Sequence, residues 1–198
     1  MTTRIIVPHR GLESAKTRLA PVLDPAARAG LAEALLRHVL EVTTAVAEVV
    51  VISPAVDLES VVVAGGARLS VQRGLGLNRG LDQARAEALA DRVDRLAVLH
   101  GDLPTLSVED VDALLIAAVG ERPMVAIAPD AAETGTNGLA FSPPDVIGFQ
   151  FGSGSFEAHR RAAKRAGAWI TLVRRPGLSF DIDTPDDLAI WLGAVGAA

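Results

Sequence analysis

Three aspartates are the residues of this chain whose type and spacing best fit metal and phosphate chemistry. Asp102 follows the apolar run 96–99, which predicts a buried strand, so its carboxylate should lie where open α/β sheets bind ligands. Asp181 and Asp183 end a second short extended run, and strand periodicity places both on one face. Magnesium needs only one or two protein carboxylates, because waters and substrate phosphates complete its octahedron. These side chains therefore predict a Mg²⁺ site that holds phosphates.

Each acidic site also has a purely structural interpretation. Asp102 could accept backbone hydrogen bonds at a strand end, and Asp181 with Asp183 could cap the final helix. The histidines show no metal-ligand spacing, and a zinc cluster would lack ligands because the chain has no cysteine. His100 is the histidine nearest to the acidic residues, and we expect it to make a supporting hydrogen bond rather than to act as a general base.

A basic loop follows the first predicted strand. Gly11, Lys16 and Arg18 lie in it and could cradle and neutralise a triphosphate. The segment nearly matches a P-loop, but Ala15 stands where that loop needs its second glycine. Pro21 would also break the helix that a P-loop lysine opens. The alternative is that the two cations are solvated at a helix start.

Two glycines precede a predicted helix. Gly74 and Gly76 would let a planar base or a phosphate approach free backbone amides at the helix N-terminus. Asn78 has a side chain that can cap this helix. The spacing does not match a dinucleotide-binding fingerprint, so by itself the segment is equally consistent with an ordinary turn.

Short apolar runs that alternate with longer Ala- and Leu-rich stretches predict an α/β fold to position these residues. The predicted strands cover residues 4–7, 49–52, 69–71, 96–99, 124–128 and 169–173. The predicted helices cover residues 26–47, 58–63, 78–89, 107–119, 156–166 and 184–192. Asp24 should cap the longest helix, and Ser107 with Asp110 should cap another. Residues 130–155, rich in Gly, Thr, Pro and Asp, predict an irregular substrate-binding region.

Composition narrows the class of protein. The chain has 198 residues, 49% of them hydrophobic, and predicts a single domain over residues 1–198 with a sizeable core. Its formal charge of -5 argues against nonspecific nucleic-acid binding. The absence of cysteine removes disulfides and thiolate chemistry and fits a reducing compartment. No apolar stretch approaches the roughly 20 residues that span a bilayer, and no signal-peptide pattern opens the chain. We therefore expect a soluble cytoplasmic protein without a membrane partner.

Seven short segments occur in order along nearly the whole chain. They are Ile5-Ile6-Val7-Pro8, Ala15-Lys16-Thr17-Arg18-Leu19, Gly76-Leu77-Asn78, Gly101-Asp102-Leu103-Pro104, Gly135-Thr136-Asn137, Phe151-Gly152 with Ser155-Phe156, and Asp181-Ile182-Asp183-Thr184-Pro185. Their combination resembles the 2-phospho-L-lactate guanylyltransferase family, which includes phosphoenolpyruvate guanylyltransferases and serves the biosynthesis of coenzyme F-420. The combination is far more specific than any one segment.

The resemblance implies a three-layer, Rossmann-like nucleotidyltransferase fold with a mostly parallel mixed sheet. It implies Mg²⁺ on Asp102, Asp181 and Asp183, with Lys16, Arg18 and Asp102 as the catalytic residues. The implied nucleotide-binding residues are Pro8, Gly11, Lys16, Gly74, Gly76, Leu77, Asn78 and Gly101. The implied phospho-acid-binding residues are Thr136 or Asn137, Gly152 and Ser155.

The partners implied by the resemblance are GTP and a small phospho-acid, phosphoenolpyruvate or 2-phospholactate. A phosphate oxygen of the acid would attack the α-phosphorus of GTP and expel pyrophosphate; this oxygen is already ionised at neutral pH, so no general base is required. The alternatives are another acceptor (3-phosphoglycerate, a sugar phosphate or molybdopterin), a glycosyltransferase, and a non-catalytic nucleotide-binding module. The sequence does not decide between a monomer and a homodimer.

Overall fold

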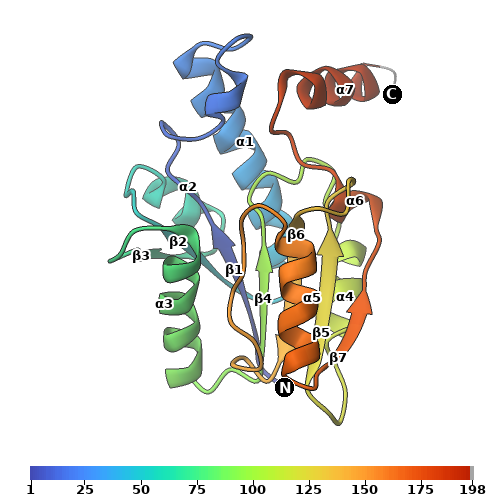
Figure 1. Ribbon diagram of the computed structural model, residues 1–198. Coiled ribbons are helices and arrows are strands. Elements are labelled where there is room, and N and C mark those ends of the chain that lie inside the picture. Colours follow the sequence, from blue (N-terminus) through green and yellow to red (C-terminus); the bar gives the residue numbers. More distant parts are fainter. Residues whose placement is uncertain (197–198) are drawn as a thin grey trace.

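A single seven-stranded sheet forms the centre of the computed structural model, which describes residues 1–196 (Figure 1). The strand order is β3-β2-β1-β4-β6-β5-β7. The strands are β1 (Thr3–Pro8), β2 (Glu48–Ser53), β3 (Arg68–Val71), β4 (Arg95–Leu99), β5 (Met124–Pro129), β6 (Thr136–Ser142) and β7 (Trp169–Leu172). β6 pairs antiparallel with β4 and β5, and the other pairings are parallel. The sheet is therefore mixed and mostly parallel, as predicted.

Helices cover both faces of the sheet and complete the predicted three layers. They are η1 (Thr17–Leu19), α1 (Pro25–Thr44), α2 (Glu59–Ala64), α3 (Leu77–Ala90), α4 (Val108–Ile116), α5 (Ser155–Arg165), α6 (Pro176–Ser179) and α7 (Pro185–Val195). Figure 1 shows α3 and α5 on one face, with α1, α2 and α4 on the other. Within residues 1–196, none of these helices combines the length and the apolar character needed to cross a bilayer.

The central strands are buried on both faces, which explains their continuous apolar runs. In β1, Ile5 packs in the cluster that contains Leu36 of α1, and its neighbour Ile6 packs in the cluster that contains Leu81 of α3. Alternate side chains of one strand thus build two separate cores. Packing of apolar side chains on both faces therefore holds β1 and β4 in the centre of the molecule.

The strand order reverses direction at β1 and β4. The chain passes from β1 through α1 to β2 on one side, and it enters β4 from α3 on the opposite face. The carboxyl ends of β1 and β4 therefore lie side by side at a point where the two connections diverge. In open α/β sheets this switch point is where ligands bind.

A third apolar cluster anchors the end of the chain. Leu188 of α7 and the preceding Ile182 pack with Leu19 of η1 and Leu35 of α1. Figure 1 shows α7 and the first half of α1 rising beyond the sheet. Because Ile182 is buried in this cluster, its two flanking residues are held over the strand ends.

Two predictions about elements were wrong. β6 lies inside the region expected to be irregular, because its Thr-Asn-Gly start looks like a turn. Gly138 is in fact a packing requirement: a Cβ there would lie 3.0 Å from Leu114 and 3.2 Å from Leu99. The acidic segment 180–183 is not a strand; it follows α6 as an unpaired stretch of backbone. Its two aspartates still share a side because they are two positions apart.

Candidate active site

A cleft of about 970 Å³ opens over the carboxyl ends of the central strands. Every residue that the sequence predicted for the site lines this cleft, except Gly11 and Asn78. The first loop, the β3–α3 loop and the segment after β4 form one part of its wall. β6, the loop before α5 and the segment before α7 form the rest. The fold thus collects segments from the whole length of the chain into one cavity.

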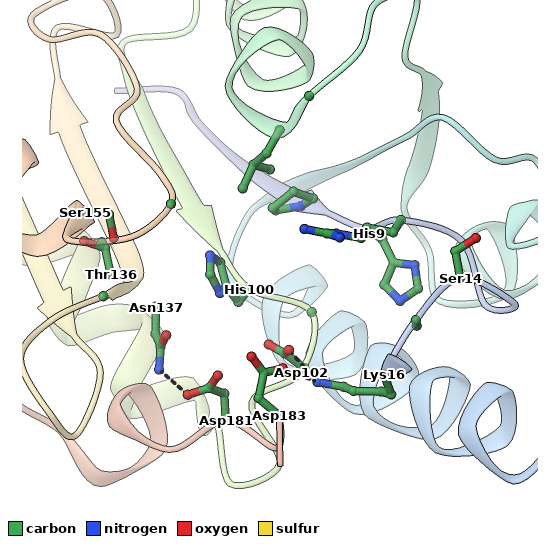
Figure 2. A pocket seen from close by; sticks show the side chains of 18 of the residues that line it. His9, Ser14, Lys16, His100, Asp102, Thr136, Asn137, Ser155, Asp181 and Asp183 are labelled. Atoms are coloured by element: carbon green, nitrogen blue, oxygen red, sulfur yellow. Dashed lines mark hydrogen bonds and ion pairs between the residues drawn. The ribbon is translucent and has the colours of Figure 1, made fainter. Parts of the chain in front are cut away.

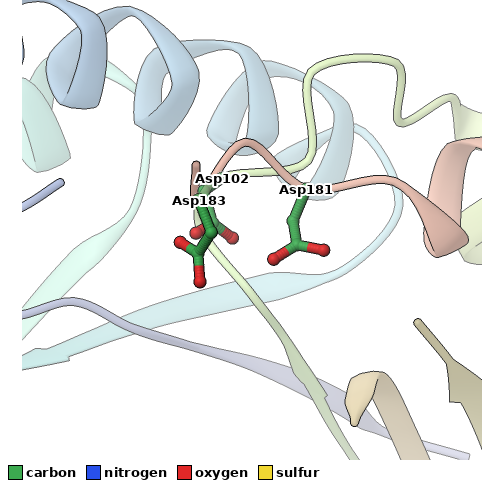
Figure 3. A group of neighbouring side chains, drawn as sticks. All are labelled: Asp102, Asp181 and Asp183. Carbon is green, nitrogen blue, oxygen red and sulfur yellow. The ribbon is translucent and has the colours of Figure 1, made fainter. Parts of the chain in front are cut away.

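The three predicted aspartates converge in this cleft. One carboxylate oxygen each from Asp102, Asp181 and Asp183 lies within 4.8 Å of the others. Figure 3 shows the three side chains pointing toward a common space from two separate segments. Thr184, and neither Asp181 nor Asp183, caps α7, so the structural alternative of helix capping is wrong.

Lys16 provides the positive charge beside this cluster. Its Nζ lies 2.6 Å from Asp102 Oδ2 and 3.4 Å from Asp183 Oδ1, and only 6% of its side chain is exposed. Arg18 Nη1 lies 3.1 Å from Asp183 Oδ2, but its side chain is 73% exposed. Lys16 is therefore a buried counter-charge, whereas Arg18 reaches over the rim of the cleft and is free to meet a ligand.

The electrostatics of the cluster differ from one aspartate to the next. Burial raises the pKa of Asp181, and the neighbouring Asp102 and Asp183 raise it further. Burial also opposes ionisation of Asp102, but Lys16 and His100 hold the pKa of Asp102 below its ordinary value. Asp102 is therefore ionised at neutral pH, and Asp181 is the member that would gain most from an added positive charge.

The donor set fits a divalent cation. Oδ1 of Asp102 is buried and has no hydrogen-bond partner among residues 1–196. Asp181 is oriented by Asn137, whose Nδ2 donates to Asp181 Oδ1 at 3.2 Å. An unpaired buried carboxylate oxygen is costly unless a ligand satisfies it, and all-oxygen donors are those that Mg²⁺ prefers.

The first loop is not a P-loop. Thr17–Leu19 form a single 3₁₀ turn, and Lys16 before it has a left-handed backbone with φ 53°. This conformation costs a lysine about 1 kcal/mol or more, and the structure holds it where Nζ reaches the aspartates. The predicted break of the helix before Pro21 is confirmed.

Gly11 and Asn78, which were predicted to contact the nucleotide, do not line the cleft, and both have structural roles. Gly11 has φ +100°, and a Cβ on it would lie 2.6 Å from Ala55 Cβ, so it allows the loop to pass close to its neighbour. Its N–H donates to His9 Nδ1 at 3.1 Å. Gly76, with φ +92°, occupies the N-cap position of α3, and Asn78 lies inside the first turn. The expected cap by Asn78 is wrong because its side chain is bound to Phe151.

The residues predicted to bind the phospho-acid lie together in the part of the cleft opposite the first loop. Figure 2 shows Thr136 and Ser155 on one side of the cleft and His9 and Ser14 on the other. Ser155 is the first residue of α5, so the N-terminus of a helix faces this part of the cleft. A helix N-terminus favours negatively charged ligands.

Sequence reasoning missed His159. This histidine is fully buried, and its ring bridges Thr136 Oγ1 at 3.1 Å and the backbone N of Gln150 at 2.9 Å. Because the backbone N–H can only donate, Nε2 accepts and the proton lies on Nδ1, which donates to Thr136. Helical spacing could have predicted this burial, because positions 155, 156, 159 and 163 form the buried face of α5.

The supporting hydrogen bond expected of the other histidine in the cleft is not seen at its Nε2. This atom of His100 is buried without a partner among residues 1–196. The ring instead lies 5.5 Å from the ring of Phe151. Figure 2 shows His100 between the two sides of the cleft.

Solved structures and relatives show which proteins this chain resembles. A protein described as a nucleotide-diphospho-sugar transferase from Desulfovibrio desulfuricans superposes with a TM-score of 0.80 at 22% identity, over 96% of this chain and 87% of its own. Phosphoenolpyruvate guanylyltransferases from Rubrobacter xylanophilus and Sphaerobacter thermophilus are each 42% identical; the alignments cover 96% and 95% of this chain and 93% and 91% of theirs. A 3-phospho-D-glycerate guanylyltransferase from Phenylobacterium zucineum is 38% identical, over 92% of this chain and 86% of its own.

The family model described as guanylyl transferase CofC like matches residues 3–193. This range contains all three aspartates, Lys16 and both sides of the cleft. The chain is therefore a nucleotidyltransferase that belongs to the CofC-like guanylyl transferase family.

Proposed function

We propose that this enzyme transfers GMP from GTP to phosphoenolpyruvate and releases pyrophosphate, as a step in coenzyme F-420 biosynthesis. The observation that carries the proposal is the 42% identity to two phosphoenolpyruvate guanylyltransferases over at least 95% of the chain. The cleft supports it, because it offers two sides that meet at a cluster of carboxylates.

The nucleotide would occupy the side formed by the first loop and the β3–α3 loop. Gly74, Gly76 and Leu77 leave space for a planar base beside free amides at the start of α3. The triphosphate would then extend past Lys16 and Arg18, whose charges neutralise phosphate oxygens. Lys16 is held in place by Asp102, so it presents a fixed charge, whereas Arg18 adapts from the rim.

The phospho-acid would occupy the side formed by Thr136, Gly152 and Ser155. Because His159 donates to Thr136 Oγ1, the hydroxyl proton of Thr136 is free to donate into the cleft. Ser155 adds a second hydroxyl and the N-terminus of α5. These donors suit a phosphate or a carboxylate and would orient the acid toward the α-phosphorus.

A magnesium ion held by Asp102, Asp181 and Asp183 would neutralise charge on the phosphates. The protein itself positions the reactants and needs no general base, because the phosphate oxygen of the acid is already ionised. This oxygen forms a bond to the α-phosphorus of GTP as the bond between that phosphorus and the bridging oxygen to the β-phosphate breaks. The products are a guanylylated phospho-acid and pyrophosphate.

A second acceptor, 3-phosphoglycerate, is favoured by the relative from Phenylobacterium zucineum. The candidate acids differ in a double bond, a methyl or hydroxymethyl group and the position of the phosphate. Small contacts in the pocket decide between such ligands.

Product analysis tests the proposal directly. The purified protein is incubated with GTP, Mg²⁺ and, separately, phosphoenolpyruvate, 2-phospholactate or 3-phosphoglycerate, and pyrophosphate and product mass are measured. We expect the guanylylated phosphoenolpyruvate to form with the highest kcat/KM. A preference for another acid would reassign the acceptor, and absence of pyrophosphate with all three would refute guanylyl transfer.

The variant Asp102→Asn tests the acidic cluster in the same assay. We expect kcat/KM to fall at least about 100-fold, because the neutral amide would hold magnesium poorly and would no longer pair with Lys16. Asp145→Asn is the matched control: this aspartate is exposed and lies outside the cleft, so activity should stay within about twofold of wild type. Near-normal activity of Asp102→Asn would contradict the assigned role.

A further inference from the structure

We propose that Asn78 is a positioning residue that couples the nucleotide side of the cleft to the phospho-acid side. Its Nδ2 donates to the carbonyl oxygen of Phe151 at 3.0 Å, and the backbone N–H of Phe151 donates to its Oδ1 at 2.9 Å. One side chain thus satisfies both main-chain groups of a residue 73 positions away. The inference rests on the proposed function, since it assumes that both ligands bind in this cleft.

The segment that Asn78 holds carries part of the phospho-acid side. Residues 148–154 form neither helix nor strand, and Gly152 and Gly154 have φ +129° and +69°. A backbone of this kind lacks the hydrogen-bond ladder of a regular element, so side-chain hydrogen bonds, together with the burial of Phe149 and Phe151 in the core, determine its position. Gly152 follows Phe151 directly and Ser155 comes three residues later, so the placement of both depends on where Phe151 is fixed.

Side chains from the helices on both sides, α3 and α5, hold the segment and the residue before it. On the phospho-acid side, His159 of α5 accepts from Gln150 N and contacts the Phe151 ring, with 4.8 Å between ring centroids. On the nucleotide side, α3 supplies Asn78, and Arg85 Nη1 also donates to Ile147 O at 2.9 Å. Asn78 is the tie that lies in the first turn of α3.

That first turn is also the end of the nucleotide loop. Gly76 is the N-cap of α3 and Leu77 its first residue, and both line the cleft, whereas Asn78 does not. A nucleotide that contacts Gly76 and Leu77 would fix the backbone from which Asn78 projects. Fixing Asn78 in turn orders Phe151 and the residues after it, so part of the entropy of ordering the acid site is already spent when the acid arrives.

The consequence is positive cooperativity between the two ligands. Since coupling free energies are reciprocal, phosphoenolpyruvate should tighten nucleotide binding by the same factor by which the nucleotide tightens phosphoenolpyruvate binding. We expect a factor of about 5 or more in the wild-type protein, the lower end of typical coupling.

Calorimetry measures this factor without turnover. The dissociation constant of phosphoenolpyruvate is determined with Mg²⁺, in the absence and in the presence of saturating α,β-methylene GTP, whose α,β linkage is not cleaved. In Asn78→Ala the ratio of the two constants should fall to within about twofold of 1. In steady-state assays at a saturating concentration of the other substrate, the KM for phosphoenolpyruvate and the KM for GTP should both rise, because the lost coupling weakens the binding of each ligand.

Two further variants make the test specific. Asn78→Asp keeps the acceptor for the Phe151 N–H but loses the donor, and it should lose most of the coupling even if Asn78→Ala folds poorly. Leu89→Ala truncates an exposed side chain near the other end of α3, and it should keep the wild-type ratio.

The outcomes are distinct. A wild-type ratio of 1, or Asn78 variants that keep the wild-type ratio, would overturn the coupling role; equal loss of nucleotide affinity with and without the acid would instead show direct nucleotide contact. A wild-type protein that binds neither ligand would refute the proposed function itself.

Discussion

Lys16 is the buried cation that pairs with two of the three aspartates in the cleft. Replacing it by methionine keeps most of the side-chain volume but leaves Asp102 and its partners without their buried counter-charge. Breaking a buried ion pair typically costs about 3–5 kcal/mol, and partial exposure of the carboxylates reduces this to about 2 kcal/mol. We expect Lys16→Met to lower the free energy of unfolding in urea by that amount and to remove turnover.

Arg18 supplies the matched comparison. Its ion pair with Asp183 is exposed, so Arg18→Ala should change stability by less than about 1 kcal/mol while raising the KM for GTP. Adding Asp183→Asn to Lys16→Met should recover part of the lost stability. If Lys16→Met were as stable as wild type, the counter-charge role of Lys16 would be wrong.

The sequence predicted which residues meet but not how each is used. Asp102 and Lys16 could be placed because strand ends and basic loops constrain where charged groups go. Asn78 was expected at a helix cap because local sequence gives no information about Phe151, 73 residues later. The partners of His159, Thr136 and Gln150, were likewise hidden from local sequence, although the spacing of α5 places His159 on its buried face.

At the scale of elements, the N-cap of α7 lies beside the cleft and the N-cap of α1 lies away from it, so the two can be compared. In α7, Thr184 and Asp187 form a capping box, and Asp187 Oδ2 also accepts from the backbone N of Asp183 at 3.1 Å. In α1, Asp24 accepts from Ala27 N at 2.8 Å. Thr184→Ala and Asp24→Ala should each cost about 1 kcal/mol in thermal or urea unfolding.

Only the α7 cap should affect catalysis. Loss of Thr184 loosens the backbone that carries Asp183, so we expect kcat/KM to fall about tenfold, whereas Asp24→Ala should leave it within about twofold. Equal kinetic effects in both variants would mean that α7 does not position the acidic segment.

Apolar periodicity and capping residues in the local sequence predicted most helices and strands. Residues that cap α1 and α7 are examples of such local features. β6 was not predicted because it depends on pairing with β4 and β5, between which it is buried. Its Gly138 is required by packing and has no favourable β propensity. For residues 180–183 the error was the reverse: a strand was expected where there is none. The alternating pattern arises because Ile182 packs with Leu188 of α7, not because the segment pairs with a strand.

Across the whole molecule, distant segments meet because the apolar runs of β1 and β4 place them at the switch point of one sheet. Parallel order cannot be read from any single strand, but it follows from helices that alternate with buried strands. The antiparallel insertion of β6 has no such signature. It brings Thr136 and Asn137 to the same edge as the ends of β1 and β4, which completes the cleft.

The buried core on the α5 face makes stability depend on pH through His159. Burial holds the pKa of His159 at about 4 in the folded protein, against 6.5 ordinarily. Above pH 6.5 the imidazole is neutral in both states; as pH falls from 6.5 toward 4, the unfolded chain binds a proton that the native protein does not, so stability is lost. The full loss is roughly 3 kcal/mol. His159→Gln, compared with wild type in urea unfolding from pH 7.5 to 4, should lack this part of the decline. An imidazole NMR signal of His159 that titrates near 6.5, or an unchanged slope in the variant, would show that the native core accepts the charge.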